Sequence, residues 1–103
     1  MIFKDYSTLS EAINDLQKQD YIEDFNLKDN CIECKIGRQI FPNDFTIEKK
    51  YLFDDGDSSV NQVELFVIVS KKYDMKGLLV NAYGIYSDTI AEDLLKKLIS
   101  VKS

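Results

Sequence analysis

The chain has 103 residues, enough for one domain with one modest core. Hydrophobic residues make up 45% of it, with one proline and four glycines, so the composition indicates a folded chain rather than a disordered one. Thirteen basic against eighteen acidic residues give a formal net charge of -5, whose field repels phosphate backbones and anionic lipids. Nucleic acids and membranes are therefore poor candidate partners.

A first helix is expected from Leu9 to Gln19. Thr8 and Glu11 have the spacing of a capping box, which marks a helix start. The expected inward face recurs at helical intervals, at Leu9, Ala12, Ile13 and Leu16. Because the opposite face is polar, we expect this helix to lie with one side on a sheet.

Two short β-prone runs follow, from Tyr21 to Leu27 and from Cys31 to Ile36, and the short polar connection between them predicts a hairpin. Gly37 and Arg38 break the second run. The segment 41–44 contains Pro42, so we expect a turn or a single helical turn there rather than a central strand.

Three further strands are expected at Thr46 to Phe53, Val63 to Val69 and Gly77 to Tyr83. The second of these contains the unbroken apolar run 65–69, which is typical of a strand buried on both faces and so places it centrally in the sheet. Short connections favour antiparallel neighbours.

The chain is expected to close with a helix. Thr89 and Glu92 repeat the capping-box spacing, and an apolar stripe follows at Ile90, Leu94, Leu95, Leu98 and Ile99. The sequence thus predicts the α+β class, as a single domain over residues 1–103 with a helix, five mainly antiparallel strands and a C-terminal helix.

The central strand is apolar on both faces, so the residues Phe66, Ile68, Leu79 and Tyr83 need cover. Either the two helices flank the sheet or a second subunit covers this face, which makes the chain a candidate homo-oligomer. Tyr83 and Tyr86 flank a glycine at a strand exit, where aromatic side chains often contact a ligand or partner. Packing into the core is the alternative for both tyrosines.

Cys31 and Cys34 have the two-residue spacing of redox and zinc sites. Residues three apart on a strand point to opposite faces, and the chain has no histidine and no second cysteine pair. Two ordinary reduced thiols are therefore favoured, with a zinc-linked assembly as the alternative.

The start of the chain lacks the apolar stretch of a signal peptide, from which we expect a cytoplasmic location.

Asp54, Asp55 and Asp57 form an acidic loop whose carboxylates suit a hard cation, although the spacing is not that of a calcium loop. A solvated hairpin turn is the favoured interpretation. The absence of histidine removes the commonest general base, so the sequence does not indicate catalysis.

Three stretches, 24–34, 41–47 and 79–86, resemble a family of short, uncharacterised bacterial proteins, and the resemblance spans nearly the whole chain. Members often carry the label phosphoribosylpyrophosphate synthetase, which implies magnesium-dependent transfer of pyrophosphate from ATP to ribose 5-phosphate. Under that resemblance Asp54, Asp55 and Asp57 would face the metal. The chain departs from the enzyme's pattern at Val60 and Asn61, where glycines should approach the phosphate.

Three hypotheses follow. The first is a non-catalytic cytoplasmic binding or regulatory domain without a cofactor, able to self-associate through the sheet face of Phe66, Ile68, Leu79 and Tyr83. The second is a magnesium-dependent enzyme acting on a ribose phosphate or nucleotide. The third is a zinc-linked assembly through Cys31 and Cys34.

Overall fold

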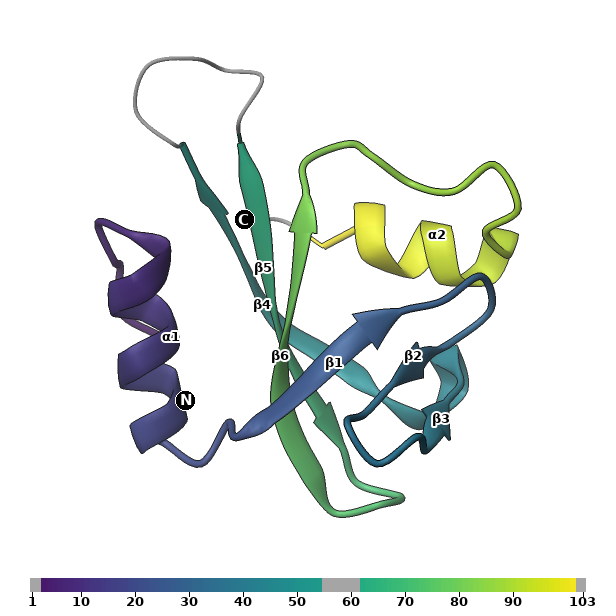
Figure 1. Ribbon diagram of the computed structural model, residues 1–103, viewed down its shortest axis with the longest axis horizontal. Helices are drawn as coiled ribbons and strands as arrows, with labels where there is room; N and C mark the ends of the chain where they lie inside the picture. Colours follow the sequence, from purple (N-terminus) through teal and green to yellow (C-terminus); the bar gives the residue numbers. More distant parts are fainter. Residues whose placement is uncertain (1–2, 55–61, 102–103) are drawn as a thin grey trace.

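The computed structural model describes residues 3–54 and 62–101 and places two helices on opposite faces of one six-stranded sheet (Figure 1). In chain order the elements are α1 (Leu9–Lys18), β1 (Glu23–Leu27), β2 (Ile32–Glu33), β3 (Gln39–Ile40), β4 (Thr46–Phe53), β5 (Val63–Ser70), β6 (Met75–Ala82) and α2 (Glu92–Ile99). The expected α+β class is confirmed. The sixth strand is β3, a two-residue strand that the sequence reading missed.

Both ends of α1 are closed by local hydrogen bonds. The Thr8 hydroxyl accepts from the Glu11 N–H at 3.1 Å, which confirms the expected N-cap. At the other end Asp20 takes a left-handed conformation (φ 75°), and the Tyr21 N–H donates to the Leu16 carbonyl. This Schellman-type ending turns the chain directly into the segment that leads to β1.

The strands lie side by side in the order β3-β2-β1-β6-β5-β4. β4, β5 and β6 form an antiparallel meander, β1 and β2 form the expected hairpin, and β1 joins the meander by pairing parallel to β6. Parallel pairing brings the two backbones close at Gly77. A Cβ there would lie 2.5 Å from Glu23 Cβ and 2.7 Å from Phe25 Cε2, so only glycine fits.

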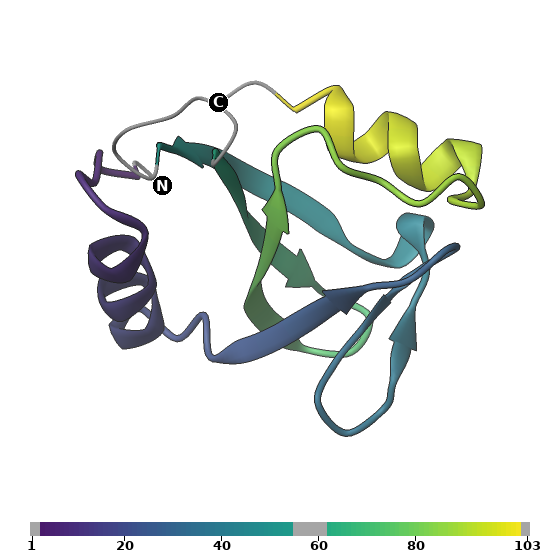
Figure 2. The ribbon, with the colours of Figure 1, turned by 45° about the horizontal axis from the view of Figure 1, so that its top comes forward.

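Each helix covers its own side of the sheet. The cluster between α1 and the sheet contains Ala12 and Leu16 of the helix together with Tyr21, Tyr51, Phe53, Leu65, Val67 and Leu78. The larger cluster lies beneath α2 and contains Phe25, Ile32, Cys34, Ile40, Phe45, Phe66, Ile68, Leu79, Leu94 and Leu98. Figure 2 shows the two helices on opposite sides of the twisted sheet. β5 is buried on both faces, as expected from its apolar run, but its expected central place is wrong, because it lies next to the edge strand β4 and the central strands are β1 and β6.

This arrangement corrects the expected self-association face. Phe66 and Ile68 are 0% exposed and Leu79 is 1% exposed, because the chain's own α2 covers them. Of the two alternatives left open by the sequence, the flanking helices are the one observed. Tyr83 alone of the four remains at the surface.

Two local expectations are wrong. Thr89 does not cap α2, because the helix begins at Glu92 with Ala91 as its N-cap, and the Thr89 N–H donates to the Ser87 hydroxyl instead. The second expected strand is shorter than Cys31 to Ile36, because β2 covers only Ile32–Glu33 and the chain then turns into β3 at Gly37, whose φ is 91°. In the described part of the chain, no helix is long and apolar enough to cross a membrane.

Candidate functional site

The one charged side chain that is fully buried among the described residues, Glu64, lies between the sheet and the loop that follows β6. Glu64 on β5 is 1% exposed, and its carboxylate forms an ion pair with Lys50 Nζ on β4 at 2.8 Å. The Tyr86 hydroxyl donates a hydrogen bond of 2.9 Å to the other oxygen of the same carboxylate, Glu64 Oε1. We call Lys50, Glu64 and Tyr86 the buried ionic cluster.

The buried ionic cluster has the chemistry of an anchor rather than of a reaction centre. Burial, together with the hydrogen bond to Glu64, raises the pKa of the Tyr86 phenol above its usual value, so this group holds its proton at neutral pH. Both Glu64 oxygens have partners, and no buried polar side-chain atom in the described ranges lacks one. An unoccupied buried acceptor or donor for a substrate is therefore not found there.

Tyr86 holds down one end of the loop after β6, and backbone hydrogen bonds hold the other. The Tyr83 N–H donates to the Gln62 carbonyl at 3.0 Å, and the Ile85 N–H donates to the Ala82 carbonyl at 3.2 Å. Gly84 supplies the positive φ of 74° that this turn needs. The loop is thus fixed at both ends while Tyr83 and Ile85 stay 48% and 66% exposed.

The predicted contact residues therefore divide into three kinds. Phe66, Ile68 and Leu79 are core, Tyr86 is the partly buried anchor, and Tyr83 faces solvent. Ile85, which stands between the two tyrosines, is more exposed than either and was not singled out from the sequence. Its signal was its place in an uncharged run at a strand exit, residues 77–87.

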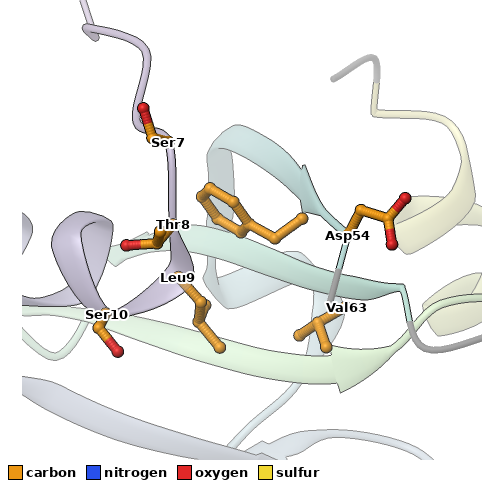
Figure 3. Close-up of a pocket in the computed structure, with 7 residues that line it drawn as sticks. Ser7, Thr8, Leu9, Ser10, Asp54 and Val63 are labelled. Atoms are coloured by element: carbon orange, nitrogen blue, oxygen red, sulfur yellow. The ribbon is translucent and has the colours of Figure 1, made fainter. Parts of the chain in front are cut away.

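Asp54 lies at a second location, in a hollow of about 360 Å³ beside the start of α1 (Figure 3). Ser7, Thr8, Ser10, Phe53 and Val63 line this hollow together with Asp54. In Figure 3 the Asp54 carboxylate and the Thr8 hydroxyl point to opposite sides, so they do not converge on one ion. Asp55 and Asp57 lie outside the described residues.

The two cysteines are free thiols, and both are buried. Cys34 belongs to the core under α2, and burial raises the pKa of the Cys31 thiol, which opposes the thiolate form that zinc binds. Among the described residues, no group of three or more cysteine, histidine or acidic side chains is placed to hold a metal ion.

A third feature is a groove of about 490 Å³ beside β1, at the point where β2 ends. Ile22 and Ile36 stand at its sides and are 68% and 80% exposed. The sequence reading missed this groove because it depends on where the pairing of two strands stops.

No protein-family model matches the chain, and comparisons with curated proteins and with solved structures return no match. The function proposed below therefore depends on the residues and their geometry.

Proposed function

We propose that this chain is a non-catalytic binding domain that self-associates through the exposed end of β6 and the loop after it. We give the name β6-end patch to four exposed residues of this stretch: Val80, Ala82, Tyr83 and Ile85. The observation that carries the proposal is that Val80, Tyr83 and Ile85 are 44%, 48% and 66% exposed on backbone fixed by strand pairing and loop hydrogen bonds.

The charge distribution supports contact between two copies at this place. The chain carries a formal net charge of -5, so most pairs of surfaces on two copies repel one another. Residues 77–87 contain no acidic or basic side chain. A two-fold axis brings a surface against itself, so an uncharged patch avoids like charges directly across the interface.

The fixed loop lowers the cost of association. A mobile loop would lose conformational freedom on binding, at about 0.5–1.5 kcal/mol for each side chain that becomes immobilised. The anchor at Tyr86 and the turn at Gly84 remove much of the backbone part of this cost before any partner arrives. Tyrosine is also well suited to such contacts, since it offers a large apolar ring and a polar tip.

A binding role fits the buried chemistry better than the alternative enzyme does. Glu64 and Lys50 neutralise each other inside the fold, and Asp54 lies apart from them in an open hollow. The buried free thiols are consistent with a reducing compartment, and we place the protein in the cytoplasm as part of the same proposal.

Light scattering over a range of protein concentrations tests the proposal. We expect a dimer for the unaltered chain and a monomer for Ile85→Asp, because the new carboxylates of the two copies would then face and repel each other across the interface. Ile36→Asp is the matched control, since Ile36 is an exposed isoleucine on the β2–β3 turn, and it should leave the dimer intact. A monomer for the unaltered chain at all concentrations would refute self-association.

The magnesium-dependent enzyme is tested on the same samples. A ligand that binds only the folded state raises the melting temperature. We expect no rise with magnesium and ribose 5-phosphate or ATP at millimolar concentration. A rise that requires magnesium would overturn the non-catalytic proposal, and a dimer that persists without any such rise would support it.

A further inference from the structure

The sheet has a gap beside β1 that its own strands do not fill. The antiparallel pairing of β1 with β2 stops at Asn26 and Glu33. Had it continued, Lys35 would stand opposite Asp24. Instead the chain leaves the sheet at Cys34 in a turn closed by the Gly37 N–H, which donates to the Cys34 carbonyl at 2.9 Å.

The backbone of Asp24 faces this gap. The Lys28 N–H donates towards β2, to the Cys31 carbonyl at 2.9 Å, and alternate residues of a strand turn their N–H and C=O groups to the same side. Asp24 lies two alternations before Lys28, so its amide and carbonyl also point to the β2 side. Within the described ranges, no residue of the sheet pairs with Asp24 on that side. We call this place the β1 notch.

The β1 notch also has a distinct side-chain lining. It coincides with the groove of about 490 Å³, which has Ile22 and Ile36 at its sides and Cys34 in its wall. Ile22 and Ile36 are the two most exposed of the large apolar side chains in the described part of the chain, at 68% and 80%. They provide apolar contact for a partner that enters between them.

The charges that line the β1 notch favour a partner with positively charged side chains. Glu23, Asp24 and Glu33 bring three carboxylates, and Lys35 brings one ammonium group. Asp24 and Glu33 project to the same face, because Glu33 stands opposite Asn26 and side chains two apart on a strand share a face. A partner with basic side chains at every second position would place them along the carboxylates of Asp24 and Glu33, the two that share a face.

We propose that the β1 notch binds an extended peptide segment of a partner protein, in which lysine or arginine alternates with apolar residues, as an added strand beside β1. Main-chain hydrogen bonds to Asp24 would supply the register, and the carboxylates and isoleucines would supply selectivity. The β1 notch shares no residue with the β6-end patch, so peptide binding and self-association are measured on different residues.

Fluorescence anisotropy with labelled peptides tests the proposal on the full chain. The probe is a six-residue peptide of alternating lysine and valine, and the matched controls are the glutamate-valine peptide and a peptide of the same composition with its lysines grouped together. We expect saturable, salt-dependent binding of the alternating basic peptide only. A fourth peptide, methylated on alternate backbone nitrogens, keeps its charge and should lose binding if it can no longer pair with β1.

Variants of the chain locate the binding. Asp24→Lys should weaken binding by about tenfold or more, because it reverses a charge at the notch. Asp88→Lys, which makes the same change on the exposed loop before α2, should leave binding unchanged. The proposal would be overturned if the peptides with alternating and grouped lysines bound equally well, or if Asp24→Lys and Asp88→Lys weakened binding equally. Either result would show that the peptides are attracted only by the net negative charge of the chain. Loss of the dimer in Ile36→Asp would put a second copy in the notch and would also overturn the proposal.

Discussion

Removing one partner of the buried ionic cluster should destabilise the fold strongly, whereas replacing the whole cluster should not. In Lys50→Met, the Glu64 carboxylate would stay 1% exposed with only the Tyr86 hydroxyl as its partner. An uncompensated charge at such a depth costs about 3–5 kcal/mol. For a domain of this size each 1 kcal/mol lowers the melting temperature by roughly 4–8 °C, so we expect a fall of roughly 12–40 °C.

The triple variant Lys50→Met, Glu64→Leu and Tyr86→Phe is the informative comparison. Because well-packed apolar residues can replace a buried ion pair at little or no cost, we expect it to recover to within about 1–2 kcal/mol of the unaltered chain. Lys72→Met is the control, since Lys72 pairs with Asp44 at 3.4 Å but is 58% exposed, and its loss should cost far less stability than the loss of Lys50.

Urea unfolding, followed by circular dichroism, measures all these free energies on one scale. An equal cost for Lys50→Met and Lys72→Met would show that Glu64 does not depend on Lys50 for its burial. A triple variant as unstable as Lys50→Met would show that packing rather than charge accounts for the loss.

Three further outcomes are expected. Gly77→Ala should cost about 3 kcal/mol or more of unfolding free energy in urea, because the added Cβ would collide with the backbone and side chains of β1. Gly37→Ala has open space around it and should cost only the roughly 1–2 kcal/mol of a residue forced into a left-handed conformation. Equal costs would contradict the close parallel pairing of β1 and β6. Cys31 should react slowly with a thiol reagent at pH 8 in the folded chain and quickly in urea, because its thiol is buried and has a raised pKa. Fast reaction of the folded chain would show that the β1–β2 hairpin opens. The folded state raises the pKa of Tyr86, so the stability that this group contributes is present below the ordinary tyrosine pKa of about 10 and is lost as pH rises above that value. Stability should therefore fall less steeply in Tyr86→Phe than in the unaltered chain from about pH 9 to 11. Parallel stability curves for the two proteins would argue against the contact between Tyr86 and Glu64.

Most of the regular structure was predictable because it follows from local patterns. The alternation over 46–53 predicted the bounds of β4 as observed. The apolar run in β5 predicted its burial on both faces, but not its place beside the edge strand β4, because burial does not specify strand order. Thr8 was recognisable as a cap because its partner Glu11 is three residues away. β3 escaped prediction because two residues carry no periodicity, and it forms only after Gly37 closes a turn.

The sites were less predictable because they depend on contacts between distant residues. Glu64 and Tyr86 are 22 positions apart, and Lys50 pairs with Glu64 only once β4 lies beside β5. The cover over Phe66 and Ile68 could be assigned to a helix or to a partner until α2 was placed in space. The β1 notch depends on where strand pairing ends, which no local pattern specifies.

Hydrogen–deuterium exchange of the unaltered chain at low and high protein concentration tests the central claim most directly, because it measures both association and its location. If two copies meet at the β6-end patch, amides of residues 80–87 should exchange more slowly at high concentration, while those of the exposed turn at residues 35–38 should exchange at the same rate. Exchange in residues 80–87 that does not change with concentration, up to the solubility limit, would contradict the account.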